Sequence, residues 1–273
     1  MQIDLHTHST ESDGALSPTQ LVHDAHAAGV SVIALTDHDT VAGLDEGAAA
    51  LPDGLTLIPG IELSATWRNC GVHIVGLNID PDNPALRSGI ARQHHTRLKR
   101  ADTIASRLEK SGFTNVLSGA QQEAGREVVC RPHFARYLVR SGQIKDERTA
   151  FKKHLGRGTR GDVREGWPDM ATVVEWIHAA GGAAVLAHPA KYKLTNLRLE
   201  ELCRAFVEAS GDAIEVISGF QHIPLTDKLA RLANRHGLLA STGSDFHKPG
   251  QAWAQLGKVP PLPSDSRPVW EHW

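Results

Sequence analysis

Five short polar motifs combine histidine with carboxylate residues at the ends of apolar runs. They read His6-Thr7-His8, Thr36-Asp37-His38-Asp39, Gly60-Ile61-Glu62, His188-Pro189 and Ser244-Asp245-Phe246-His247. Imidazole and carboxylate groups bind divalent cations, and a ligand set without thiolates favours manganese, iron or zinc over magnesium or calcium. The motifs together predict a metal site.

Each motif alone is weak evidence for a metal. A lone histidine such as His94 or His178 is typical of a surface or capping position, and Asp39 could equally cap the next helix. The pairs are more informative, because alternation along a strand directs His6 and His8 to the same side. Several such pairs at strand ends are hard to explain by hydrogen bonding alone.

The elements that must position these motifs are seven apolar, β-branched runs. They cover residues 3–5, 31–35, 56–61, 72–79, 183–187, 213–217 and 238–241. Helical patterns separate several of them; one starts at a Ser17-Pro18-Thr19-Gln20 capping box and stops at Gly29, and another covers residues 170–180. Alternating strands and helices predict a parallel sheet, which seven strands could close into a barrel. The strand ends, and their ligands, would then converge on one face.

Residues 85–165 differ from the rest of the chain in charge and pattern. They hold 18 Lys and Arg against 8 Asp and Glu, whereas the remaining residues hold 11 against 23. Helical patterns occur near residues 97–110, 133–141 and 147–155, with no convincing strand. We therefore expect a first barrel part over 1–84, a basic helical insertion over 85–165 and a second barrel part over 166–273. The basic stretch is either a solvated helical face or a grip on an anionic substrate.

Composition places the chain among ordinary soluble proteins. It is 41% hydrophobic and 22% charged, and no apolar run approaches the length of a membrane span. The first residues lack the basic start and apolar stretch of a secretory signal, so we expect a cytoplasmic protein without membrane association. Cys70, Cys130 and Cys203 form no C-x-x-C pair and indicate neither disulfides nor a thiolate zinc site.

The five motifs, in this order, resemble those of the PHP (polymerase and histidinol phosphatase) domain phosphoesterases. Within that family the chain is most similar to the nucleoside 3′,5′-bisphosphate phosphatases and the related ribonuclease AM (5′-3′ exoribonuclease) group. The shared segments are VHIVGL at 72–77, HFAR at 133–136 and GSDFH at 243–247. The chain departs from those relatives at 190–192, where Ala-Lys-Tyr replaces Gly-Arg-Tyr, and at 161–163, where Gly-Asp-Val replaces Gly-Tyr-Val.

The resemblance implies a distorted (β/α)7 barrel with a helical insertion and three divalent metal ions. Manganese is the expected metal, with iron or zinc as alternatives. One ion would be held by Asp13, His38 and His247, a second by His6, His8, Glu62 and Asp245, and a third by Glu62, His73 and His133. Glu62 would bridge two ions. The assignments of His73 and His133 rest mainly on the resemblance.

The implied reaction is in-line hydrolysis of a phosphoester by a metal-bridging hydroxide. The substrate would be a nucleoside 3′,5′-bisphosphate, such as adenosine 3′,5′-bisphosphate, or the 5′ end of an RNA that loses nucleotides. His188, Glu62 and Asp245 are the candidate catalytic residues, with His188 either positioning phosphate or protonating the leaving oxygen. Arg131 is the best candidate for binding substrate phosphate, followed by Lys191, Arg160 and His222, although a structural role for Arg160 is equally plausible.

Three other functions stay open. The chain could hydrolyse another small phosphate monoester, or could be a metal-dependent amidohydrolase, whose sequences also begin with H-x-H but usually add a bridging lysine on a strand. It could also be a non-catalytic PHP module that binds nucleic acid, although such a module is expected to have lost ligands that are all present here. The choice between a mononucleotide and a short RNA, the oligomeric state and any protein partner are not indicated by the sequence.

Overall fold

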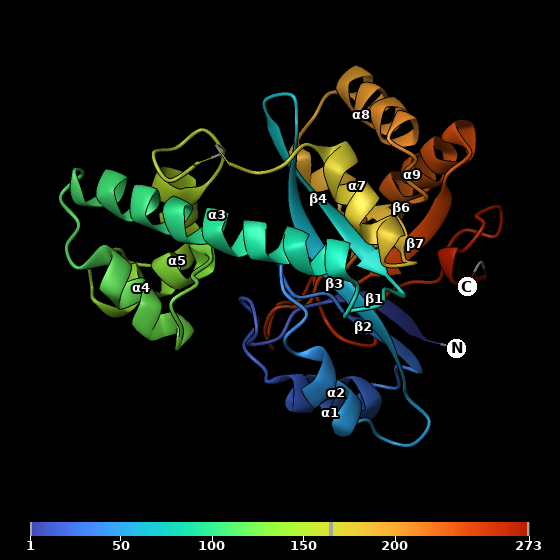
Figure 1. Ribbon diagram of the computed structural model, residues 1–273, viewed down its shortest axis with the longest axis horizontal. Coiled ribbons are helices and arrows are strands. Elements are labelled where there is room, and N and C mark those ends of the chain that lie inside the picture. Colours follow the sequence, from blue (N-terminus) through green and yellow to red (C-terminus); the bar gives the residue numbers. More distant parts are fainter. Residues whose placement is uncertain (1, 164–165, 272) are drawn as a thin grey trace. The chain divides into compact units, whose positions relative to one another are not determined.

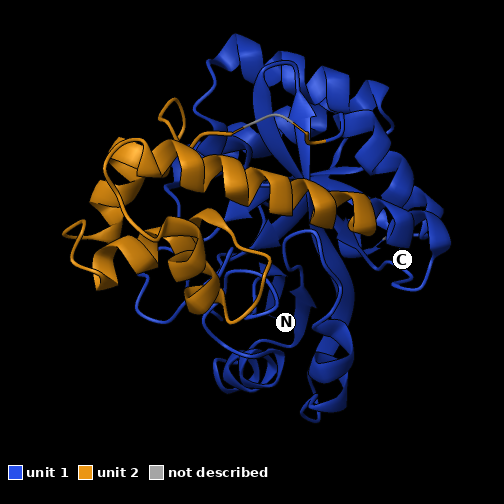
Figure 2. Cartoon of the chain, turned by 60° about the vertical axis from the view of Figure 1, so that its left-hand side comes forward, with its two compact units in different colours: residues 1–89, 168–273 blue, residues 90–167 orange. Residues whose placement is uncertain are grey.

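The computed structural model describes residues 2–163, 166–271 and 273, which form two compact units (Figure 2). The first, which we call the barrel unit, combines residues 1–89 and 168–273. The second, the helical unit, is residues 90–167. None of the described helices is both long and apolar enough to cross a bilayer.

Seven strands in the described part of the barrel unit form one sheet in chain order (Figure 1). They are β1 (Ile3–Thr7), β2 (Val32–Leu35), β3 (Thr56–Trp67), β4 (Cys70–Leu77), β5 (Ala183–Leu186), β6 (Ala213–Ser218) and β7 (Leu239–Gly243). The sheet curls until its first and last strands meet, since Thr7 bridges Phe246 just beyond β7. The result is a nearly closed barrel, and the predicted α/β barrel class is confirmed.

Strand direction differs from the sequence-based expectation at one place. β1, β2 and β3 pair in parallel, as do β5, β6 and β7, but β4 runs antiparallel to both β3 and β5. The expectation of a wholly parallel sheet was therefore wrong. Only Arg68 and Asn69 separate β3 from β4, and two residues allow a hairpin but not the long crossover that parallel neighbours need.

Helices cover the outside of the barrel (Figure 1). They are α1 (Pro18–Ala27), α2 (Leu44–Ala49), α7 (Met170–Ala179), α8 (Asn196–Glu208) and α9 (Ile223–His236). The predicted capping box of α1 is present: the Ser17 hydroxyl accepts from the Gln20 backbone N, and the Gln20 side chain accepts from the Ser17 backbone N. It satisfies two backbone donors that the first turn would otherwise leave open.

An aliphatic cluster drawn from strands around the sheet fills the barrel. Its buried members are Ile3, Leu5, Ala34, Val75, Leu77, Val185, Ala187 and Ala213, joined by Val269 of the short η3 helix (Val269–Glu271). A rigid apolar core of this kind supports the strand ends, which carry the polar motifs.

The helical unit holds no strand among its described residues. It contains most of α3 (Pro84–Glu109), then α4 (Val116–Ala124), α5 (Arg131–Arg140), α6 (Glu147–Ala150) and the π-helical η1 (Phe151–Leu155). Leu108, Val116, Phe134 and Leu138 belong to its own buried core. The sequence indicated helices within the α3, α5 and α6–η1 segments but missed α4, whose short pattern is interrupted by Gly119.

Candidate metal centre

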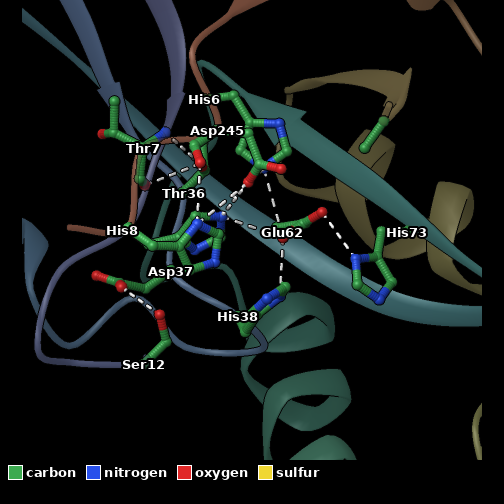
Figure 3. A network of polar contacts seen from close by, with 12 residues as sticks. His6, Thr7, His8, Ser12, Thr36, Asp37, His38, Glu62, His73 and Asp245 are labelled. Atoms are coloured by element: carbon green, nitrogen blue, oxygen red, sulfur yellow. Dashed lines mark hydrogen bonds and ion pairs between the residues drawn. The ribbon is translucent and has the colours of Figure 1, made fainter. Parts of the chain in front are cut away.

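The carboxylate of Glu62, near the middle of β3, is the centre of a cluster of imidazoles (Figure 3). It is fully buried. Its Oε1 lies 2.8 Å from Nδ1 of His73 and 2.9 Å from Nε2 of His188. Its Oε2 lies 2.8 Å from Nδ1 of His38, 3.3 Å from Nε2 of His8 and 3.4 Å from Nε2 of His6.

Asp245, which follows β7, provides a second carboxylate close to His6 and His8 (Figure 3). Its Oδ1 lies 3.6 Å from Nε2 of His6 and 3.3 Å from Nε2 of His8. Asp245 has a positive φ of 53°, a conformation that Asp tolerates better than most residues. His6 of β1 and His8, which directly follows that strand, thus both face Glu62 and Asp245.

Asp13, in the loop after β1, joins the cluster through two further histidines. Its Oδ1 lies 3.3 Å from Nε2 of His247 and 3.8 Å from Nε2 of His38. His8 stacks on His247 with ring centroids 4.1 Å apart. The side chains of His8, Asp13, His38 and His247 therefore present ligand atoms that all lie within 4.8 Å of one another.

Buried carboxylates that are not candidate ligands hold this cluster in place. Glu215 of β6 accepts from Nδ1 of His6 at 3.0 Å and from the backbone N of His188. A carboxylate on the far nitrogen fixes the orientation of a metal-binding imidazole, here with Nε2 of His6 toward Glu62. Glu215 was not among the site residues predicted from the sequence, although an acid inside the apolar run 213–217 was an available signal.

Asp37 and Asp39 support loops and strands instead of joining the cluster. Asp37 accepts from the hydroxyls of Ser9 and Ser12, each at 2.6 Å, and so holds the loop that carries Asp13. Asp39 accepts from the backbone N and hydroxyl of Ser64 on β3, at 2.7 and 2.9 Å. The alternative that Asp39 caps the next helix was wrong, since α2 begins only at Leu44.

Burial and charge act against each other on the ionisable groups of the cluster. Burial alone would raise the pKa of Glu62, but His38, His73 and His6 hold that pKa well below its usual range. Burial, reinforced by His247 and His38, lowers the pKa of His8 to about 3. Glu62 is therefore an anion and His8 a neutral imidazole, and these are the forms that bind cations.

Several potential metal-ligand atoms at the centre of the cluster make no hydrogen bond. Nε2 of His6, Nε2 of His8 and Oε2 of Glu62 are buried, and none has a hydrogen-bond partner in the described part of the chain. Buried polar atoms without partners are costly unless something else binds them. Their convergence fits a cation, and the nitrogen and oxygen donors suit manganese, iron or zinc.

His188 and Lys191 line the edge of the same cluster from the η2 helix region (Pro189–Tyr192), after β5. His188 has a positive φ of 29° and reaches Glu62 with Nε2. The ammonium of Lys191 pairs with Oδ2 of Asp245, and the Lys191 side chain as a whole is about half exposed. Burial would lower the pKa of Lys191, but Asp245 raises it, so the side chain stays charged.

The remaining predicted site residues lie elsewhere or in the helical unit. His222 is exposed at the start of α9 and joins none of the ligand groups. His133 is buried on α5, where its Nδ1 accepts from the Cys130 backbone N at 2.8 Å. Arg131 donates to the carbonyl of Leu155 at 3.4 Å, and Arg160 to the hydroxyl of Ser111 at 2.7 Å. The metal role of His133 and the substrate roles of these arginines stay predictions.

The order and identity of these residues can be compared with known protein families. Residues 4–159 match the PHP domain, over more than half of the chain. The chain belongs to the PHP family. Its barrel is the PHP fold that the sequence motifs predicted. Most ligand-type side chains lie at or just after strand ends, but Glu62, which the sequence placed at the end of a strand, lies within β3, because that strand continues to Trp67.

Individual relatives extend the match over nearly the full length. A 5′-3′ exoribonuclease of Haemophilus influenzae is 45% identical over 98% of this chain and 97% of its own length. A 3′,5′-nucleoside bisphosphate phosphatase of Chromobacterium violaceum is 44% identical over 98% of this chain and 95% of its own. A solved structure of an amidohydrolase from Chromobacterium violaceum, with sulfate and no metal, superposes with a TM-score of 0.91 at 42% identity, covering 100% and 95% of the two chains.

Proposed function

We propose that this chain is a metal-dependent phosphoesterase that hydrolyses nucleoside 3′,5′-bisphosphates, removes 5′ nucleotides from RNA, or does both. The observation that carries the proposal is the convergence at the barrel mouth of ligand atoms of His6, His8 and Glu62 that are buried and have no hydrogen-bond partner among the described residues. The names of two relatives at 44% and 45% identity support the choice of substrates. Both reactions cleave a phosphoester beside a ribose.

The ligand sets support sites for divalent cations, which we propose to be three manganese ions, with iron or zinc as alternatives. Asp13, His38 and His247 would hold one, and His6, His8, Glu62 and Asp245 the second. Glu62 and His73, together with His133 of the helical unit, would hold the third. His38 lies with Glu62 and His73 in one ligand group, so it is a further candidate for that ion. Such cations lower the pKa of water and stabilise charge on phosphoryl oxygens.

The chain's own residues would perform the other steps. The Lys191 side chain is half exposed, and its ammonium can pair with a phosphate oxygen as well as with Asp245. His188 can hold a phosphate or give a proton to the leaving oxygen, because its ring lies beside Glu62 while Glu215 fixes its backbone. Asp245 and Glu62 supply the negative charge that keeps cations in the site.

We propose that Arg131 of the helical unit contributes a further anion contact, because bisphosphates and RNA carry more than one phosphate. Arg160 is a weaker candidate, since its guanidinium already binds the hydroxyl of Ser111. His222 is exposed and could contact substrate only beyond the cluster. These roles rest on charge and resemblance.

Product analysis tests the proposal. The chain, loaded with manganese, is incubated with adenosine 3′,5′-bisphosphate and separately with a 5′-phosphorylated oligoribonucleotide. Release of inorganic phosphate from the first, or of 5′-mononucleotides from the second, is the expected result. Failure to cleave either substrate, with hydrolysis of a different phosphate monoester, would move the function to that monoester.

Amidohydrolase activity is a second candidate because the solved relative from Chromobacterium violaceum bears that name. Amidohydrolases usually have a bridging lysine on a strand. Lys191, the lysine beside the cluster, lies instead in η2 after β5, which argues against this activity. The same preparation should therefore be tested on a cyclic amide. Amide hydrolysis without phosphoester hydrolysis would reverse our preference.

Metal analysis provides an independent check. Nine proposed ligands are too many for one tetrahedral site. We expect more than one transition-metal equivalent per chain in active protein, measured by plasma mass spectrometry after gel filtration. A fully active preparation that holds a single equivalent would contradict the clustered site.

A further inference from the structure

A pocket opens beside the metal cluster, within the barrel unit, and the proposed reaction leaves its apolar part without a role. Its volume is about 220 Å³, which is below the ~300–1,000 Å³ of sites for drug-sized ligands. Pro189, Leu225 and Leu229 form part of its apolar lining, and Phe220 and Trp253 add two aromatic side chains. The pocket therefore has room for one ring system and not for a large ligand.

The two aromatic residues of the pocket are exposed to an unusual degree. Phe220 is 65% exposed and Trp253 is 61% exposed, although large aromatic side chains normally bury most of their surface. A backbone hydrogen bond of 2.7 Å from Phe220 N to Trp253 O ties their loops together. Gly219 permits this approach, because a Cβ there would lie 2.1 Å from the Trp253 carbonyl oxygen. The fold thus places two solvent-exposed aromatic side chains, Phe220 and Trp253, at one pocket.

The polar lining connects the pocket with the metal cluster. His188 and Lys191 both line it, and the same residues contact Glu62 and Asp245. Ser218 also lines the pocket, and its buried hydroxyl has no hydrogen-bond partner among the residues that the structure describes. One end of a ligand in the pocket would therefore lie toward the residues proposed to hold the cations.

We propose that this pocket binds the nucleobase of the substrate, which rests on the proposed function and specifies how that site recognises a nucleotide. The base lies against Phe220 and Trp253, while its sugar phosphate passes Lys191 and His188 toward the cluster. Stacking of a base on an aromatic ring is favourable and tolerates any base, because every base has a π face.

The residues that line the pocket predict that it accepts any of the four bases. The side chain of Gln221 is occupied, because its amide donates to the Val216 carbonyl and the Thr226 hydroxyl. Ser218 then offers one hydroxyl, which can donate to or accept from a base edge. One adaptable hydroxyl cannot distinguish four bases, so purine and pyrimidine nucleotides should differ by only a few-fold in affinity.

Binding of two product-like probes tests the base site without relying on turnover. Isothermal titration calorimetry with the manganese-loaded chain compares adenosine 5′-monophosphate with ribose 5-phosphate, which carries the same phosphate but no base. We expect the wild-type chain to bind the nucleotide at least about tenfold more tightly. Phe220→Ala and Trp253→Ala should each remove most of that preference and leave the affinity for ribose 5-phosphate unchanged.

A matched control is Leu197→Ala, which removes an exposed apolar side chain, 71% exposed, from α8 outside the pocket. It should keep the full preference for the nucleotide. Equal affinity of the wild-type chain for both probes, or retention of the preference in both aromatic variants, would overturn the base site. A preserved base preference in a chain that cleaves no bisphosphate or RNA would support the base site and reject the proposed reaction.

Discussion

Glu62 illustrates how much of the site depends on single residues. Five imidazoles from the described residues lie within 3.4 Å of its two oxygens, and they come from β1, β4 and the loops after β1, β2 and β5. Without a cation, such a cluster leaves buried donors unsatisfied. The side chains around Glu62 are therefore arranged for binding and contribute little to the apolar core.

His8→Ala and Asp245→Asn should abolish phosphoester hydrolysis and leave the fold largely intact. Both side chains lie at the barrel mouth, and Asn tolerates the positive φ of residue 245 about as well as Asp. Turnover and the circular dichroism spectrum measure the two effects. His94→Ala and Asp82→Asn, at exposed positions, are the controls and should keep the wild-type rate. A near-wild-type rate in either site variant would show that the ligand assignment is wrong.

Glu215→Gln tests the orienting role of a residue that binds no metal itself. The amide can no longer accept from both His6 Nδ1 and the His188 backbone N, so the imidazole of His6 loses its fixed orientation. We expect metal affinity to fall by about 10–100-fold, measured by competition with a chelator. Unchanged affinity would mean that the contact between Glu215 and His6 is only structural packing.

At the scale of elements, β1 is irregular where it changes from apolar to polar residues. Leu5 belongs to the aliphatic core and His6 to the polar cluster. The pairing register between β1 and β2 shifts between Asp4 and Thr7, so this irregularity includes both residues. Asp4 is buried there, accepts from the Ser244 backbone N at 2.7 Å and has a pKa raised to about 6 by burial.

The closure of the barrel at β1 and β7 depends on Gly243. A Cβ at this position would lie 2.3 Å from the His6 Cβ, so Gly243→Ala must push the two strands apart. We expect a loss of about 1–3 kcal/mol in the free energy of unfolding, with weaker metal binding. Urea denaturation measures the first effect. Gly71→Ala in β4, where nothing lies within 4 Å of the new methyl, is the matched control and should change stability little.

At the scale of the whole molecule, charge is divided between a basic insertion and an acidic remainder. Residues 85–165 carry an excess of ten positive charges and the other residues an excess of twelve negative charges. The basic residues of the insertion would attract an anionic substrate, and this attraction would make substrate binding sensitive to salt.

Arg131→Ala should lower kcat/KM much more for adenosine 3′,5′-bisphosphate than for an aryl phosphate, and should weaken the salt dependence. The bisphosphate has a second phosphate that needs a cationic partner, whereas the aryl phosphate has only one phosphate. Initial rates at two salt concentrations measure both effects. Arg140→Ala is the control on the same helix, because Arg140 pairs with Glu123. Equal losses on both substrates would place Arg131 at the scissile phosphate, and no loss would leave the insertion a solvated face.

Short motifs in the sequence were enough to predict most of the residues in the cluster and one helix cap. Residue type and position at strand ends predicted the side chains that gather around Glu62, since these features need only the alternation of a strand and the ends of neighbouring strands. The capping box at Ser17 is local as well, because its partners lie within one turn. The resemblance to PHP proteins, carried by the same motifs, supplied His73, which lies 2.8 Å from Glu62.

Contacts between distant segments were decided only by the tertiary structure. Glu215 holds His6 from 209 positions away, and no short motif marks that pair. The reversal of β4 follows from a two-residue turn that hydrophobic periodicity does not distinguish from a longer connection. The pocket between Phe220 and Trp253 requires a backbone hydrogen bond across 33 residues, so neither aromatic residue stood out in the sequence. Sequence thus specified which groups could do chemistry, while folding determined which of them meet and what supports them.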